Sequence, residues 1–285
     1  MTDVLPNPAL ALHGILSQLT QSSARSVADG WGLALGCEVG SPEFPRRHAE
    51  VVGLFTDTLT RVEALPAGVT LKARVARYAP AWYAAVVFTG NSWSTTSAPP
   101  SGILDLMVLD HLQAVGEQLS ERQDEPRVDG STVDAILKNL EEWEAILEEG
   151  GLPADVVGQI RGHVSQIRWL VSNVDRFGAS RVIAESNQLA GAGVSAMARS
   201  TKPSVRQKVG AAIAGLLFFV NLANGFVDDV TGVIDGVAAM PDKIHELVIE
   251  YRDPLELEAN TPLELERGPE SPDDGVVDAE TVPEN

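Results

Sequence analysis

The chain has 285 residues, of which 44% are hydrophobic and 21% charged, and its formal net charge is −19. This composition is typical of a globular protein with a buried core, in one large domain or two smaller ones. The negative charge repels nucleic acid phosphates and anionic lipid headgroups at long range, so neither is a default partner, and no nucleic acid partner is predicted. Cys37 is the single cysteine and allows no internal disulfide, and the first residues show no signal peptide. We therefore predict a cytoplasmic protein.

Apolar residues recur at three- and four-residue spacing through the first half of the chain, which predicts amphipathic helices. Helices are expected over residues 8–20, 23–36, 46–65 and 103–120. Asn7 is the expected N-cap of the first helix, and the two prolines of SPEFP predict a loop over 41–45. Residues 69–90 alternate as a strand would and also fit a helix; the helical surroundings favour the helix.

A charged, proline-containing segment, ERQDEPRVDG, separates the two halves of the chain. It predicts an N-terminal helical domain over 1–125 and a C-terminal helical domain over 131–251. From Pro254 to the end the chain has ten acidic residues and one basic residue, Arg267, and it lacks aromatic residues. We expect residues 252–285 to be a disordered acidic tail.

The second half is also predicted to be helical, over residues 131–149, 153–174 and 177–200. Small residues dominate the end of the last of these helices, QLAGAGVSAMA, and would let a neighbouring backbone approach closely. Next comes VGAAIAGLLFFVNLANGFV, residues 209–227, which contains no charged residue or histidine. The predicted fold class is all-α, a multi-helix bundle with a glycine- and alanine-rich apolar C-terminal helical region.

The apolar segment 209–227 has two possible roles, and both stay open. It is either a core helix that packs against this chain or a second copy, or a membrane-inserted helix, since its length nearly spans a hydrocarbon layer. Burial is favoured because its strongly apolar run is short and it contains asparagines. The candidate residues for a protein or membrane interaction are Leu216, Phe219, Val220, Asn221, Asn224, Phe226, Asp228 and Asp229.

The block EAILEEGGLPADVVGQIRGHVSQIRWLVSNVDRFGASRV has a leucine-proline helix start and an aromatic-glycine helix junction at Phe177-Gly178. In these features it resembles a helical pair of uncharacterised bacterial all-helical proteins, over roughly residues 131–240. The resemblance implies a helical fold and a role in bacterial conflict with phage. It supplies no catalytic residues.

No catalytic, cofactor-binding or metal-binding motif emerges from the sequence, and no small-molecule substrate is identified. The five histidines lack the spacing of metal ligands, and Cys37 has no adjacent basic residue that would activate it. The sequence AGAGVSA at 190–196 imitates a dinucleotide fingerprint but lies in a predicted helix, where tight helix packing explains it. The acidic residues of 141–149 are the expected solvated face of their helix. We predict a non-enzymatic helical interaction or regulatory protein with a protein partner or self-association; a membrane-acting effector is the alternative.

Overall fold

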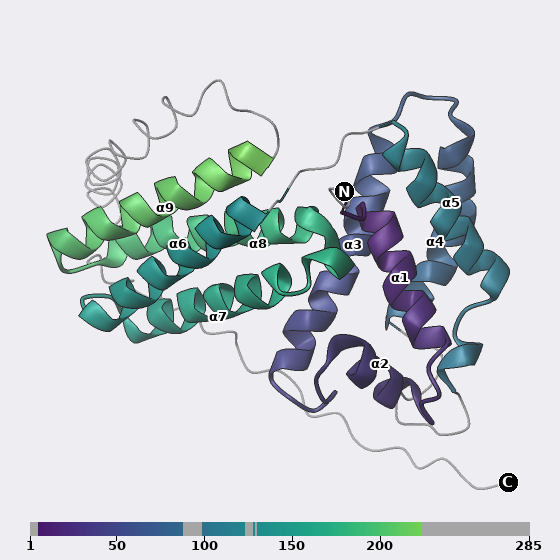
Figure 1. The fold of residues 1–285 in the computed structure, drawn as a ribbon, viewed down its shortest axis with the longest axis horizontal. Coiled ribbons are helices and arrows are strands. Elements are labelled where there is room, and N and C mark those ends of the chain that lie inside the picture. The colour runs from purple at the N-terminus through teal and green to yellow at the C-terminus, as the bar shows by residue number, and fades with distance from the viewer. Residues whose placement is uncertain (1–4, 88–98, 123–127, 129, 224–285) are drawn as a thin grey trace, which may run out of the picture. The chain divides into compact units, whose positions relative to one another are not determined.

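A computed structural model describes residues 5–87, 99–122, 128 and 130–223. The α-helices of these residues are α1 (Pro8–Thr20), α2 (Val27–Leu35), α3 (Glu43–Glu63), α4 (Thr70–Val87), α5 (Leu106–Ser120), α6 (Gly130–Glu149), α7 (Ala154–Val171), α8 (Val174–Arg199) and α9 (Pro203–Ala223). A short 3-10 helix, η1 (Pro100–Gly102), precedes α5. No strand occurs among the described residues, and the predicted all-α, multi-helix fold is confirmed (Figure 1).

Asn7 begins α1 as predicted and also attaches it to α5. Its side-chain oxygen accepts hydrogen bonds from the backbone N–H groups of Ala9 and Leu10, both at 3.0 Å. Its amide nitrogen donates to the carbonyl of Gly116 in α5 at 2.7 Å. A Cβ at Gly116 would lie 2.6 Å from the side chain of Leu10, so glycine is needed for this close approach. One buried amide therefore caps a helix and fixes its neighbour.

Two expectations for the first half need correction, and one ambiguity is resolved. The predicted loop over 41–45 is wrong, because α3 begins at Glu43 and includes Pro45. Proline fits a first helical turn, where backbone N–H groups have no partner within the helix. The second helix starts at Val27 rather than at 23, after Ser26 as its N-cap. Residues 70–87 are helical, as favoured, even though the helix contains Pro80.

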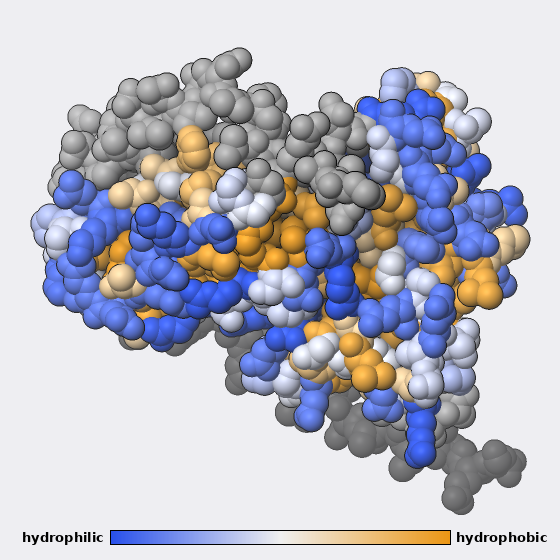
Figure 2. All heavy atoms as spheres, viewed as in Figure 1, coloured by the Kyte–Doolittle hydropathy of each residue, from blue (hydrophilic) through white to orange (hydrophobic). Residues whose placement is uncertain are grey.

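In the second half, α9 packs against α8 and α6, and α7 packs against the same two helices. The small residues of α8 serve close packing, as predicted: a Cβ at Gly193 would lie 2.6 Å from Trp143 and 2.9 Å from Ile213. Gly150 and Gly151, both with positive φ, form the turn from α6 to α7. In the view of Figure 2, hydrophilic residues cover the outer surface over α6 and α7, and hydrophobic residues gather between these helices and α8.

The predicted helix junction at Phe177-Gly178 is a kink within α8. Gly178 has φ 70° and ψ 170°, a conformation open essentially to glycine alone. A Cβ there would overlap the carbonyl oxygen of Pro6, which approaches the kink from the start of the chain. Helix α8 also contacts both α1 and α3, so it connects the helices of the two halves. The predicted division into domains of residues 1–125 and 131–251 stays a prediction, and the predicted tail lies outside the described residues.

Candidate functional site

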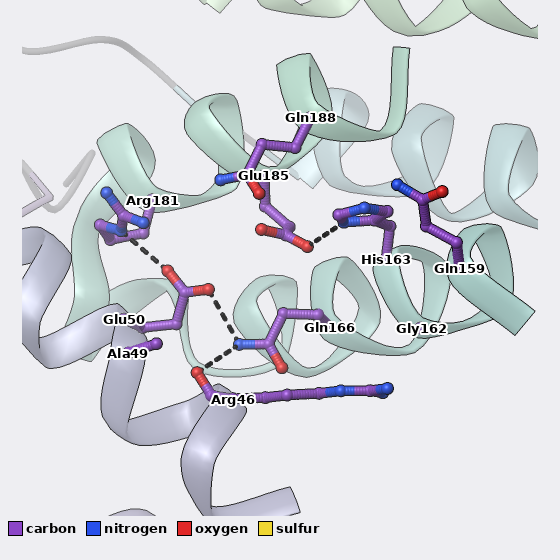
Figure 3. A pocket seen from close by; sticks show the side chains of 10 residues that line it. All are labelled: Arg46, Ala49, Glu50, Gln159, Gly162, His163, Gln166, Arg181, Glu185 and Gln188. Atoms are coloured by element: carbon purple, nitrogen blue, oxygen red, sulfur yellow. Dashed lines mark hydrogen bonds and ion pairs between the residues drawn. The ribbon is translucent and has the colours of Figure 1, made fainter. Parts of the chain in front are cut away.

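A polar pocket lies where α3, α7 and α8 meet, and it has a volume of about 410 Å³ (Figure 3). The pocket is lined by Arg46, Ala49, Glu50, Gln159, Gly162, His163, Gln166, Arg181, Glu185 and Gln188. Its volume falls within the range of about 300–1,000 Å³ that is usual for small-molecule sites. Its lining is unusual in that several of the charged and amide side chains are buried.

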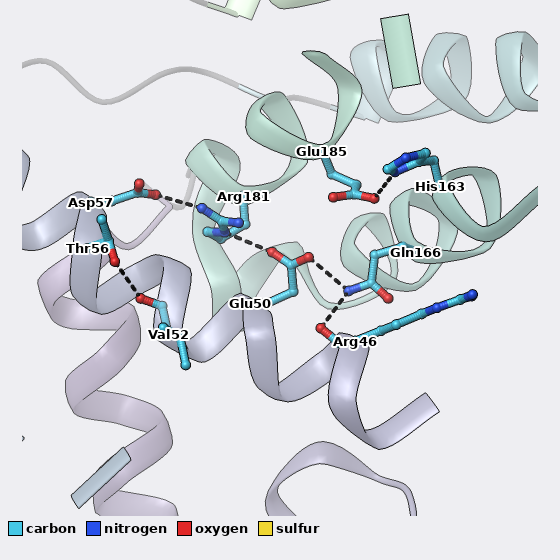
Figure 4. Close-up of polar contacts among 9 residues, drawn as sticks. All are labelled: Arg46, Glu50, Val52, Thr56, Asp57, His163, Gln166, Arg181 and Glu185. Carbon is cyan, nitrogen blue, oxygen red and sulfur yellow. Dashed lines mark hydrogen bonds and ion pairs between the residues drawn. The ribbon is translucent and has the colours of Figure 1, made fainter. Parts of the chain in front are cut away.

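The inner wall of the pocket is an ion-pair cluster around Arg181 of α8. Its Nε donates to a carboxylate oxygen of Glu50 at 2.8 Å, and its Nη1 donates to Asp57 at 3.1 Å (Figure 4). Both acidic residues belong to α3, and Gly53 lies between them: a Cβ there would come within 2.6 Å of the guanidinium nitrogens. Burial alone would lower the pKa of Arg181, but the two carboxylates raise it above its ordinary value.

Gln166 of α7 completes this cluster. Its amide nitrogen donates to Glu50 at 3.0 Å and lies 3.5 Å from the backbone carbonyl of Arg46. Burial raises the pKa of the Glu50 carboxyl, and this rise is opposed by Arg181 and Gln166. The hydrogen bonds connect three helices through side chains of buried residues, namely Glu50, Gln166 and Arg181. Such a connected network holds its members in fixed positions.

Beside this cluster lies a histidine–carboxylate pair. Nδ1 of His163 in α7 lies 2.7 Å from a carboxylate oxygen of Glu185 in α8. Because an ionised carboxylate can only accept, this nitrogen is the donor, and in the neutral ring the other nitrogen, Nε2, is an acceptor. Glu185 is buried, and the side chain of His163 is 18% exposed. The pair therefore presents an oriented imidazole to the pocket.

Several polar groups of the pocket have no partner among the described residues. The guanidinium of Arg46 forms no ion pair there, and Nε2 of His163 forms no hydrogen bond. The same holds for the amide oxygen of Gln166 and the second carboxylate oxygen of Glu185. The unpaired atoms of His163, Gln166 and Glu185 are not fully buried, and Arg46 is an exposed residue, so solvent reaches each of them. A ligand entering the pocket would meet side chains held by the hydrogen bonds above and the exposed guanidinium of Arg46.

The sequence-predicted interaction residues lie elsewhere, in and after α9. Leu216 is fully buried and Val220 is 9% exposed. Phe219 is half-buried against the core, with its ring 5.5 Å from that of Phe218 in an edge-on arrangement. The side chain of Asn221 is not described. The remaining predicted residues lie outside the described part of the chain: Asn224, Phe226, Asp228 and Asp229.

Other expectations about chemistry can be compared with the structure. Within the described residues, no three His, Cys, Asp or Glu side chains lie together as a metal site would require. Residues 190–196 are helical within α8, so they form no phosphate-binding loop. Cys37 is half-buried and lies beside a second hollow next to α2. None of the helices in the described ranges combines the length and apolar character needed to cross a membrane.

The pocket was not predicted from the sequence, although a signal was present. Arg181 and Glu185 fall on the same three- and four-residue repeat as Val182 and Leu189, which are buried in α8. A charged residue at a core-facing position needs a partner, and that need is readable from the pattern. The pattern does not indicate which residue is the partner, because Glu50 lies 131 residues earlier than Arg181.

Comparison of the chain with protein-family models, curated proteins and solved structures finds no significant match.

Proposed function

We propose that this chain is a helical regulatory protein that binds a small polar molecule in the pocket between α3, α7 and α8. The observation that carries the proposal is the set of polar groups left open, among the described residues, in an otherwise hydrogen-bonded pocket. These groups are the guanidinium of Arg46, Nε2 of His163, the amide oxygen of Gln166 and one oxygen of Glu185. Small-molecule sites combine a concave surface with a few polar groups fixed in this way.

The cost of the ion-pair cluster supports the same proposal. Burying Glu50 and Arg181 requires both charges to leave water, and well-packed apolar residues of similar volume are often equally or more stabilising. The chain also has glycine at position 53 of α3, where a side chain would displace the guanidinium. Since stability alone does not require these features, we attribute them to a binding function.

The position of the pocket suggests how occupancy would be transmitted. One wall, α3, belongs to the first half of the chain, whereas α7 and α8 belong to the second half. A ligand that touches all three helices binds best to one arrangement of them and so favours that arrangement. We propose that a protein partner or a second copy of the chain responds to this change. A role in bacterial conflict with phage, implied by the resemblance of residues 131–240, stays a prediction.

The proposal can be tested by asking whether the protein retains a small molecule. The purified full chain would be mixed with a low-molecular-weight cell extract, separated by gel filtration and analysed by mass spectrometry. We expect the wild-type chain to retain a specific polar compound. Gly162→Leu should abolish retention, because its side chain would enter the pocket; already a Cβ there lies 3.2 Å from the Arg46 guanidinium.

Gly158→Leu is the matched control. Gly158 lies one turn earlier on α7 and is exposed, and a Cβ at this position would meet nothing within 4 Å. Both changes remove a helical glycine and add the same apolar side chain, so they share any effect on helix propensity. Retention by wild type and Gly158→Leu but not by Gly162→Leu supports the proposal. Retention of nothing, or equal retention by all three proteins, contradicts it.

A further inference from the structure

The charged residues that line the pocket differ in burial. Glu50, Arg181 and Glu185 are buried, whereas Arg46 is exposed; Figure 3 shows these side chains around the pocket. Glu50 is already paired with Arg181 and Gln166, whereas one oxygen of Glu185 is free of protein partners among the described residues. We call the buried part of the lining, with Glu50, Arg181 and Glu185, the inner end and the exposed part at Arg46 the outer end. Among the described residues, the inner end offers an unpaired carboxylate oxygen and the outer end an unpaired guanidinium.

From this arrangement we propose that the ligand is a small zwitterion of the α-amino acid class, with an ammonium group and a carboxylate group. The inference rests on the proposed binding function and specifies its ligand. The ammonium is assigned to the inner end and the carboxylate to Arg46.

The inner end suits an ammonium group. The free acceptors there, within the described part of the chain, are the second oxygen of Glu185 and, in the neutral imidazole, Nε2 of His163. An ammonium has three N–H donors and accepts nothing, so it matches a site made of acceptors. Glu185 also adds to the rise in the pKa of Glu50, as expected for two carboxylates near each other, and an ammonium beside Glu185 would offset this effect.

The outer end suits a carboxylate. The guanidinium of Arg46 presents its planar fork of donors without an ion-pair partner among the described residues, and this geometry binds a carboxylate through two hydrogen bonds. Gly162 lets the guanidinium rest against α7, since a Cβ there would lie 3.2–3.3 Å from it. The amides of Gln159 and Gln188 also line the pocket and can add neutral donors.

The balance of charge favours a ligand without net charge. Among the lining residues, the two arginines are matched by the two glutamates when His163 is neutral. The whole chain carries −19, which disfavours the approach of anions at long range. A zwitterion satisfies both ends of the pocket and adds no net charge.

The inference is tested by isothermal titration of the full chain with each of the twenty amino acids. The best binder is then compared with its deaminated acid and its decarboxylated amine, which each lack one charged group. We expect each analogue to bind about tenfold or more weakly, as for the loss of one charge-assisted hydrogen-bonded contact. Arg46→Gln should weaken binding of the amino acid by a similar factor and leave binding of the decarboxylated amine unchanged. Glu185→Gln should leave binding of the deaminated acid unchanged.

Arg161→Gln is the control for the loss of a positive charge, because Arg161 is an exposed residue of α7 outside the pocket lining. It should bind the amino acid as the wild type does. If either analogue binds as tightly as the amino acid, or if Arg161→Gln weakens binding as much as Arg46→Gln, the zwitterion inference is overturned. If no amino acid binds but a compound is retained from cell extract, the ligand class is wrong and the proposed function stands. If the extract also yields nothing, the proposed function fails as well.

Discussion

The guanidinium of Arg181 lies against Gly53 of α3, where the absence of a side chain makes room for it between Glu50 and Asp57. The first prediction follows from this contact. Gly53→Ala should lower the free energy of unfolding by on the order of 3 kcal/mol, because the new Cβ forces the guanidinium away from at least one buried partner. Urea unfolding measures the change.

Gly191→Ala is the control for this prediction. Gly191 lies in α8 and is exposed, and a Cβ there meets nothing within 4 Å. Replacing glycine by alanine within a helix should then stabilise the chain by roughly 0.5–1 kcal/mol. Equal effects of the two substitutions would show that the contact between Arg181 and Gly53 is unimportant.

The second prediction concerns the energetics of the ion pair. Arg181→Met alone should destabilise the chain by about 3–5 kcal/mol, since it leaves the buried carboxylate of Glu50 without its cation. The double variant Glu50→Leu/Arg181→Met should recover most of this loss, because two apolar side chains replace two desolvated charges. Unfolding of both single variants and the double variant gives the coupling energy. A double variant as unstable as the sum of the two single variants would mean that Glu50 and Arg181 are not coupled, and it would contradict the prediction.

The third prediction is a pH dependence that arises from His48. Burial lowers the pKa of this histidine below 6.5, an effect partly opposed by its hydrogen bond to the carbonyl of Val86. The folded chain then binds this proton more weakly than the unfolded chain does. The stability that neutral His48 contributes is fully present above 6.5 and is lost as the pH falls through the lowered pKa.

His48→Gln tests the pH prediction, because glutamine can still donate to Val86 and does not ionise. We expect its melting temperature to fall less than that of the wild type between about pH 7 and about pH 5. Part of the pH dependence that remains in the variant is expected to come from His13, because burial also lowers the pKa of that histidine. If the melting temperatures of wild type and variant fall equally over this pH range, His48 is ruled out as the source.

The fourth prediction distinguishes two residues of α9. Leu216 is fully buried, so Leu216→Ala should cost about 2–5 kcal/mol through lost burial and a cavity. Truncating a fully buried phenylalanine to alanine costs about 3–5 kcal/mol. Phe219 is only half-buried, so Phe219→Ala should cost less than this. Thermal unfolding of both variants checks the order. A larger loss for Phe219→Ala would mean that its contacts extend beyond those described for α9.

The helical fold was predictable because most helices carry their own signals. Asn7 caps α1, Gly150 ends α6, and apolar repeats mark the buried faces between such boundaries. Where the sequence misled, local chemistry was compatible with two outcomes. Pro45, for example, is as acceptable in the first turn of α3 as in a loop.

The pocket was not predictable, because it depends on contacts between residues far apart in the chain. In the sequence His163 is a histidine without nearby metal ligands, and its partner Glu185 lies on another helix. Arg181 could have been identified as a charge on a buried face. Its placement against Gly53 depends on how α3 and α8 pack, which periodicity does not encode.

The most direct test of the whole account is ligand retention by the double variant Glu50→Leu/Arg181→Met. If the ion pair is kept for binding rather than for stability, this protein should fold and melt near the wild-type temperature yet retain no compound from cell extract. A folded double variant that retains the same compound as the wild type, in the same amount, would contradict the central claim.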